Sequence, residues 1–132
     1  MKSISFDDMP AERFERFDIV GHQINRHLVS NALTGTSGII IDHITFPPGF
    51  IHRMHRHPHA DQFMIPMVGQ LRVESAGAEP LDVQPGQIMV LARNTWHEVI
   101  NLGSQDCVCI HIFSGVETIG EIGFEPFDGR KS

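Results

Sequence analysis

Three histidines and a glutamine are the side chains of this chain best suited to chemistry: His55, His57, Gln62 and His97. Because side chains alternate along a β-strand, His55 and His57 project from the same face of one strand. Residues 58–61, which include a proline, favour a turn that returns the chain as a neighbouring strand carrying Gln62. Imidazole nitrogens and an amide oxygen can bind a divalent transition metal. We therefore predict one such ion held by these four residues, with zinc, nickel, iron and manganese all open.

The spacing of these residues resembles the two sequence motifs of the cupin family. The segment GFIHRMHRHPHADQFMIPMVG, residues 49–69, resembles the first motif, and residues 86–101 resemble the second. The matching positions are Gly49, His55, His57 and Gly69 in the first motif and Gly86, His97 and Asn101 in the second. The resemblance is close over residues 49–101 and loose in the flanking strands. It implies an all-β fold of the cupin type, a double-stranded β-helix or jelly-roll barrel, around one metal site.

Gln62 departs from the cupin pattern, which usually has a glutamate at this position. Three neutral imidazoles and a neutral amide leave the charge of a divalent ion uncompensated, so the ion should acidify bound water more strongly and be held less tightly. This glutamine variant is similar to the cupins that linearise unsaturated uronic acids in pectin and alginate breakdown. Ala92 and Asn94 replace the Pro and Gly of the second motif, and asparagine tolerates the left-handed backbone that glycine favours.

His111 is the candidate for proton transfer. An imidazole ordinarily titrates near neutrality, so it can act as an acid or a base. The uronate-linearising cupins carry an acidic residue and an aromatic residue two apart on the corresponding strand, and these positions map onto His111 and Phe113. The histidine there, and Glu117 near where those cupins have arginine, depart from their pattern. A core histidine bonded to a backbone carbonyl is the alternative interpretation.

Three residues are assigned to a substrate pocket: Arg53, Met64 and Phe113. Alternation assigns Arg53 and Met64, whereas the resemblance assigns Phe113, because alternation alone leaves open which face of its strand lines the pocket. Arg53 shares the face of His55, where it either binds a substrate carboxylate or lies at the mouth of the barrel. Met64 and Phe113 each follow a candidate site residue by two positions and therefore share its face. His52 has the opposite parity to His55 and is expected to point away from the pocket.

Length and composition limit the possible classes of protein. A chain of 132 residues has the size of one domain. The net charge of −6 argues against nucleic acid as a partner. The first residues lack the apolar run of a secretory signal, and no stretch reaches membrane-spanning length, so we expect a cytoplasmic protein with no membrane partner. Cys107 and Cys109, one residue apart on an expected strand, are expected to be buried and reduced.

The expected elements are almost entirely β-strands. Short apolar or alternating runs between turns predict strands over residues 21–30, 38–46, 50–57, 62–68, 70–75, 87–91, 97–102 and 107–113. One short helix is expected over Met9–Phe17, with Asp8 as its N-cap. The chain then divides into an N-terminal arm, residues 1–20, a barrel, residues 21–116, and a tail, residues 117–132, packed on the barrel and frayed at its end.

The apolar residues of the N-terminal arm predict a homodimer. Four of them precede the barrel and are too apolar to lie free in water: Ile4, Phe6, Phe14 and Phe17. We expect some of them to cover an open sheet edge of a partner chain.

Three functions fit these residues. The leading hypothesis is a metal-dependent enzyme that acts on a small oxygenated substrate, a sugar acid or other carbonyl or carboxylate compound, by isomerisation, ring opening or elimination. An Fe(II)-dependent dioxygenase would use the same ligands and leave positions open for substrate and oxygen. A non-catalytic module would use the barrel as a small-molecule pocket. Fold alone does not separate these functions, because one fold hosts many activities.

Overall fold

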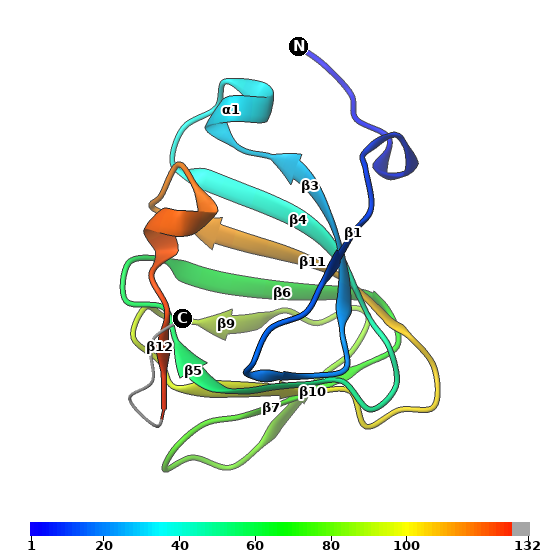
Figure 1. Ribbon diagram of the computed structural model, residues 1–132, viewed down its shortest axis with the longest axis vertical. Helices are drawn as coiled ribbons and strands as arrows, with labels where there is room; N and C mark the ends of the chain where they lie inside the picture. Colours follow the sequence, from blue (N-terminus) through cyan, green and yellow to red (C-terminus); the bar gives the residue numbers. More distant parts are fainter. Residues whose placement is uncertain (128–132) are drawn as a thin grey trace.

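The computed structural model describes residues 1–127, which form two antiparallel β-sheets packed face to face (Figure 1). In spatial order, the first sheet contains β1 (Glu12–Phe14), β3 (Gln23–Val29), β4 (Ile39–Phe46), β11 (Cys107–Ser114), β6 (Asp61–Val68) and β9 (Met89–Leu91). The second contains β12 (Glu125–Pro126), β5 (Ile51–Arg56), β10 (His97–Ile100), β7 (Leu71–Glu74) and β8 (Leu81–Val83), with β2 (Ile19–Val20) also paired to β5. The all-β jelly-roll expected from the sequence is confirmed.

Helical structure within residues 1–127 is limited to short segments: η1 (Phe6–Asp8), α1 (Asn31–Thr34) and η2 (Ile119–Ile122). The single turn of α1 lies where only a loop was expected. The Ser30 side chain accepts a hydrogen bond from the Leu33 N–H at its start, and Gly35 ends it in a left-handed conformation with φ 71°. Over residues 1–127, no helix has the length and apolar character needed to cross a membrane.

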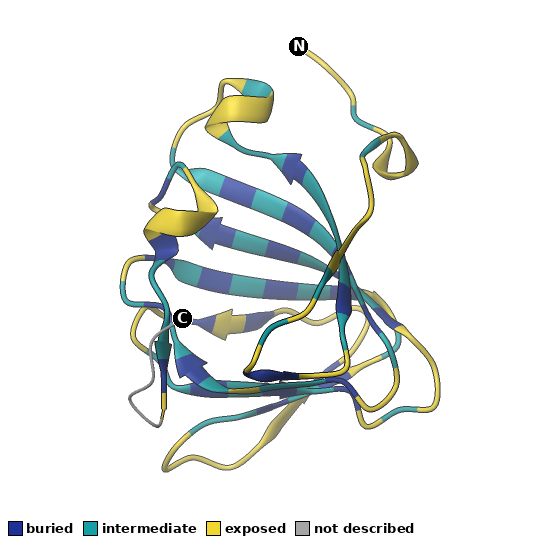
Figure 2. Ribbon diagram, viewed as in Figure 1, coloured by how far each residue is buried: buried dark blue, intermediate teal, exposed yellow. Residues whose placement is uncertain are grey.

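Buried and half-buried residues alternate along the long strands (Figure 2). Because successive side chains of a strand point to opposite faces, this alternation puts the core between the two sheets. Along β4 and β11, buried residues alternate with half-buried ones over the whole strand. The main cluster includes Ile44, Phe46, Phe50, Met64, Leu71, Val73, Val83, Met89, Leu91 and Val99. Cys107 and Cys109 belong to this cluster as buried free thiols, as expected.

Three residues of the sequence motifs shape the turns and loops between the strands. Gly69 has φ 73°, and a Cβ at this position would lie 2.6 Å from the carbonyl oxygen of Asp106. Asn101 is buried, and its Nδ2 donates to the Phe46 carbonyl at 2.9 Å. Asn94 adopts the left-handed conformation, with φ 67°, that its place in the second motif predicted.

The prediction of a helix over Met9–Phe17 is wrong. Only η1, just before it, is helical, and Asp8 ends that turn instead of capping a helix. The segment that follows forms β1, which pairs antiparallel with β3. The open edge of β3 offers backbone hydrogen bonds, and Phe14 packs against the main core cluster. These tertiary interactions outweigh the propensity of a segment too short to be a stable helix by itself.

Up to residue 127, the C-terminal segment contains η2 and β12. β12 adds to the edge of β5, with Pro126 opposite His55. Residues 128–132, which include the end expected to fray, lie outside the described residues.

The apolar residues of the arm contact their own chain. The Phe6 ring lies 5.2 Å from the His43 ring, and the Phe17 ring lies 6.5 Å from that of Phe124, both between centroids. Ile4 lines a small surface hollow with Leu28. Because these side chains already pack within their own chain, they give less reason to expect that the arm covers the sheet edge of a partner chain.

The outward face of the first sheet gives a stronger reason to expect a partner chain. The strand registers set Ile41, Ile112, Phe63 and Val90 in one row across β4, β11, β6 and β9. Val90 is 60% exposed, and the next row sets Ile110 beside Ile65. Contiguous apolar patches of this kind are typical of protein interfaces.

We expect the protein to be a homodimer that buries this outward face. Ile112→Lys places a charge at the centre of the row and should therefore give a monomeric mass in light scattering at micromolar concentration. Leu81→Lys, on β8 of the other sheet, is the matched control and should leave the dimer intact. A monomeric mass for the unmodified chain would contradict the expectation.

Candidate metal centre

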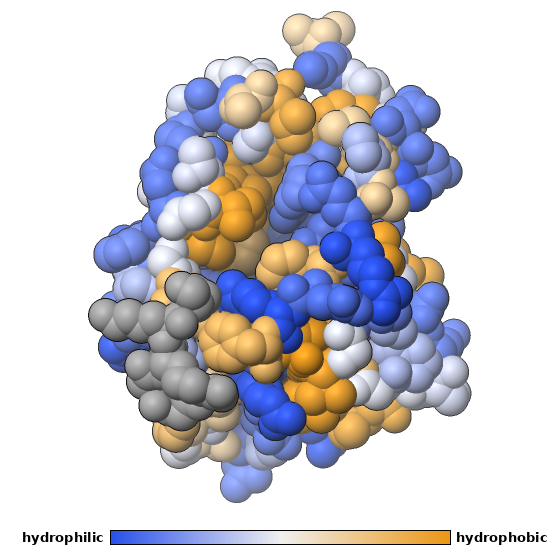
Figure 3. Space-filling model, viewed as in Figure 1, coloured by the Kyte–Doolittle hydropathy of each residue, from blue (hydrophilic) through white to orange (hydrophobic). Residues whose placement is uncertain are grey.

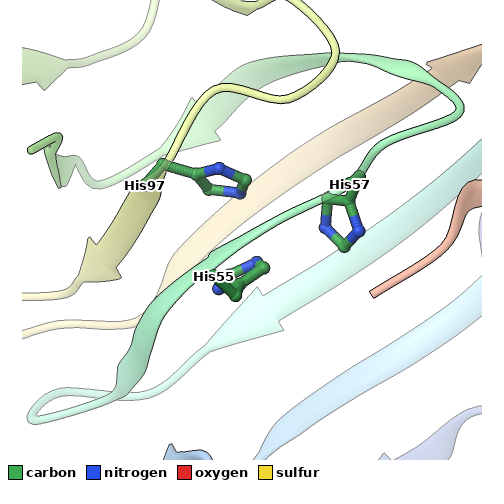
Figure 4. Close-up of side chains that lie close together, drawn as sticks. All are labelled: His55, His57 and His97. Atoms are coloured by element: carbon green, nitrogen blue, oxygen red, sulfur yellow. The ribbon is translucent and has the colours of Figure 1, made fainter. Parts of the chain in front are cut away.

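Three buried imidazoles converge at one end of the second sheet. His55 on β5 lies opposite His97 on β10, and His57 directly follows the last residue of β5. Their rings turn toward one another (Figure 4). One ring nitrogen from each residue lies within 4.8 Å of the other two, and none of the residues is more than 8% exposed. A metal ion bound by three histidines requires this convergence.

The main chain sets the tautomer of each imidazole. Nδ1 of His55 donates to the Arg53 carbonyl at 2.6 Å, and Nδ1 of His97 donates to the Thr95 carbonyl at 2.8 Å. Nδ1 of His57 donates to the carbonyl of Gly123 at 2.8 Å. A neutral imidazole that carries its proton on Nδ1 has a free lone pair on Nε2. The three Nε2 atoms are therefore prepared as metal ligands.

Burial keeps these imidazoles neutral. Desolvation lowers the pKa of His57 to about 4 and the pKa of His97 to about 3. Desolvation, together with the neighbouring imidazoles, holds the pKa of His55 far below its ordinary value. The neutral form is the one that binds a metal, so no proton has to be displaced from these rings at neutral pH.

Gln62 lines the same cavity as the three imidazoles. It lies on β6, is 5% exposed, and its Nε2 donates to Nδ1 of His111 at 3.2 Å. Its Oε1 is buried without a hydrogen-bond partner, as is Nε2 of His97. Buried polar atoms without partners are rare in proteins, and each of these two has a lone pair that a cation could accept. The donor set of three imidazole nitrogens and an amide oxygen fits a divalent transition metal.

The site opens into a cavity of about 560 Å³ between the sheets. Seen from outside, this face of the molecule is hollowed, and apolar side chains gather along the hollow (Figure 3). The cavity is lined by all four expected ligands and, among other residues, by His111, Phe113, Phe46, Val99, Ile122 and Phe124. It therefore joins a polar centre to a largely apolar wall.

The structure corrects the pocket assignments of Arg53 and His52. On β5, His55 pairs with His97 but His52 pairs with Val99, so the strand contains an irregularity between these pairs. A bulge adds a residue to one strand, so residues before and after it that differ by an odd number can face the same side of the sheet. Arg53 is exposed and does not line the cavity, so the predicted pocket role is wrong. His52 lines the cavity instead, and its ring stacks on His55 with centroids 3.8 Å apart.

The other predicted pocket residues divide between the cavity and the core. Met64 faces inward but is fully buried in the main core cluster, and it does not line the cavity. Phe113 lines the cavity and packs edge-on to His57, with ring centroids 5.6 Å apart. His111 also faces the cavity, but burial lowers its pKa to about 3. It is therefore neutral at physiological pH, instead of poised near neutrality as the sequence suggested.

A layer behind the metal centre was not predicted from the sequence. The Asp18 carboxylate accepts hydrogen bonds from Nε2 of His52 at 2.7 Å and from Nε of Arg16 at 2.8 Å. Burial by itself would raise the pKa of Asp18, but these bonds outweigh it and hold that pKa well below its usual range. The Arg16 guanidinium lies 3.7 Å from the centroid of the Phe124 ring, which in turn stacks on His55. Arg16, Asp18 and Phe124 come from segments near the two ends of the chain, and no local motif marks them.

Comparison with known proteins identifies similarity over the region that holds the site. The family model described as Cupin domain matches residues 42–113. Among curated proteins, none matches the chain.

Several solved structures have a similar fold. A predicted oxalate decarboxylase from Thermotoga maritima is 16% identical, with a TM-score of 0.77 over 87% of this chain and 100% of that one. The polyketide cyclase RemF from Streptomyces resistomycificus is 16% identical, with a TM-score of 0.75 over 86% of this chain and 79% of that one. KdgF from Halomonas sp. is 22% identical, with a TM-score of 0.66 over 83% of this chain and 90% of that one. At these identities the likeness concerns the fold.

Protein purified without a chelator should contain about one transition-metal ion per chain by elemental analysis. His57→Ala and His97→Ala should each lose most of this metal, because each removes one ligand. His59→Ala, which removes an exposed imidazole close to the site, is the matched control and should keep it. Full metal content in both ligand variants would contradict the assignment.

Gln62→Glu should bind the metal about tenfold more tightly or better, equivalent to about 1.4 kcal/mol, because the carboxylate offsets one charge of the ion. Competition with a chromophoric chelator measures this affinity. Gln23→Glu introduces the same charge at another buried glutamine of the cavity wall and should change the affinity much less. Equal effects in the two variants would remove Gln62 from the ligand set.

Proposed function

The chain belongs to the cupin family through its Cupin domain, and we propose that it is a metal-dependent enzyme acting on a small oxygenated substrate. One observation carries the proposal: a single cavity collects three neutral imidazoles, the unpaired oxygen of Gln62 and the unpaired Nε2 of His111. A purely structural metal would not need the additional imidazole facing an accessible chamber. Convergent polar groups in a largely apolar pocket are typical of ligand-binding and catalytic sites.

The polar wall of the cavity favours a hydroxylated substrate. The His27 ring bridges two carboxylates, with Nδ1 3.0 Å from Asp42 and Nε2 3.2 Å from Glu12. Nearby on β3, Nε2 of Gln23 donates to Oδ1 of Asn25 at 2.8 Å. All five residues line the cavity, whose volume of about 560 Å³ suits a molecule of monosaccharide size. This wall supports a sugar acid over an apolar aromatic compound.

The residues divide the work of an isomerisation, ring opening or elimination. When bound, a divalent metal would act as a Lewis acid on a substrate oxygen. That ion would be held by His55, His57, Gln62 and His97. His111 would hydrogen-bond a reacting oxygen of the substrate through Nε2. Phe113 and Phe124 supply apolar walls that exclude water from the reacting groups.

The likeness to the uronate-linearising cupins supports this substrate class only in part. Gln62 matches the glutamine variant of that group. His111 replaces the acidic residue of those cupins, so the proton must be handled differently here. We therefore propose a sugar acid as the substrate class and leave the position of its double bond or ring oxygen to experiment.

The proposal predicts turnover that does not require oxygen. Zinc-, nickel- or manganese-loaded protein, incubated anaerobically with unsaturated uronates and related sugar acids, should convert at least one of them, as followed by proton NMR. His97→Ala should abolish conversion together with metal binding. His111→Gln should lower turnover about a hundredfold while keeping the metal. His59→Ala should leave turnover unchanged.

Two outcomes would overturn the proposed reaction. Conversion only with Fe(II) and with consumption of oxygen would assign the site to a dioxygenase. If a sugar acid shows specific shifts in its proton NMR spectrum on binding but is not converted, the chain is a small-molecule binding module.

A further inference from the structure

Gln62 and His111 are joined by a hydrogen bond between their side chains, and this bond determines which ring nitrogen of His111 carries its proton. Gln62 lies opposite Phe113 in the pairing of β6 with β11, and His111 is two residues before Phe113 on the same inward face. The Gln62 Nε2 and His111 Nδ1 atoms are 3.2 Å apart, and both side chains are 5% exposed. Water therefore cannot easily replace either partner.

The chemistry of the amide fixes the direction of this hydrogen bond. An amide NH2 group only donates, so Nδ1 of His111 must accept. A neutral imidazole has a single N–H, which must then lie on Nε2. An imidazolium would instead direct a second N–H at the amide NH2, with two donors facing each other.

The opposite orientation of the amide conflicts with the metal centre. Turning the amide over would direct its oxygen at His111 and put the NH2 group where the unpaired Oε1 now lies, the atom that the proposed ligand set assigns to the ion. An amide NH2 offers no lone pair to a metal and carries a positive partial charge. This step rests on the proposed metal-dependent function, because the ion is what requires the oxygen to face it.

We propose that Gln62, besides its place in the ligand set, is a positioning residue that fixes His111 as a neutral Nε2–H hydrogen-bond donor to a substrate oxygen. Nε2 of His111 is buried, has no partner, and belongs to a residue that lines the cavity. A buried donor without a partner is unfavourable, and a carboxylate, carbonyl or hydroxyl oxygen of the ligand would satisfy it. His111 thus stabilises negative charge on that oxygen and is not a general base.

The residue at position 62 therefore decides which ring nitrogen of His111 carries the proton. A glutamate at position 62, the usual residue of the cupin pattern, could accept a hydrogen bond from Nδ1–H of His111. The proton would then leave Nε2 free as an acceptor toward the cavity. One change in the ligand set therefore reverses the hydrogen-bonding polarity of His111.

Nitrogen NMR of histidine tests this pairing directly. Protein labelled with 15N-histidine is examined metal-free and zinc-loaded by long-range proton–nitrogen correlation at neutral pH, and the His111 signals are identified by their loss in His111→Gln. We expect an unprotonated Nδ1 and a protonated Nε2 in the unmodified chain. Gln62→Glu should give a protonated Nδ1. Asp42→Asn, which removes a charge from the residue paired with His111 on β4, is the control and should leave the pattern unchanged.

The outcomes separate this inference from the proposed function. A protonated Nδ1 in the unmodified chain overturns the inference even if the protein converts a sugar acid. The spectrum of the unmodified chain decides the question if Gln62→Glu does not fold. The expected tautomer without turnover on any substrate supports the pairing while the proposed reaction fails.

Discussion

The hydrogen bonds from three imidazole Nδ1 atoms to main-chain carbonyls are the constraint on which the rest of the site depends. They fix both the orientation of each ring and the nitrogen left free for an ion. The acceptors belong to β5, to the turn before β10 and to Gly123 after η2, so the site is complete only when these three segments meet. The second sheet and the C-terminal segment are thereby tied to the chemistry, and not only to the packing, of the barrel.

Much of this arrangement follows from the sequence where strands are regular. Alternation groups Gln62 with Met64 on β6 and His111 with Phe113 on β11, and the structure keeps these groupings because both strands pair without interruption over this part of the sheet. For β11, the inward face was expected from the resemblance and not from alternation. The same rule fails on β5, where the irregularity between His52 and His55 exchanges the faces of the intervening residues. No residue type in that segment marks the irregularity, since backbone pairing with β10 produces it. Arg53 was misplaced for this reason.

The residues that were not predicted from the sequence were missed for a different reason. Arg16 and Phe124 are separated by most of the chain, yet they form a cation–π contact over His55. Neither lies in a recognisable motif, and the segment around Arg16 was assigned to a helix that would have aimed it elsewhere. Long-range packing of this kind is fixed by the closed barrel, so it becomes visible only when both ends of the chain are placed. The candidate metal ligands, in contrast, are marked by local spacing in the sequence.

The neutrality of the ligand set has a consequence for what the cavity accepts. Every protein donor at the centre is uncharged, because burial keeps the imidazoles neutral and Gln62 replaces an acidic residue. A divalent ion there would keep its full charge in a poorly solvated chamber, where charges interact more strongly than in water. An anionic or strongly polarised oxygen supplies the missing charge, and a neutral Nε2–H donor at His111 would favour the same oxygen. The glutamine in place of the usual cupin glutamate, and the histidine in place of the acidic residue of the uronate-linearising cupins, therefore act in one direction, toward binding negative charge at the substrate.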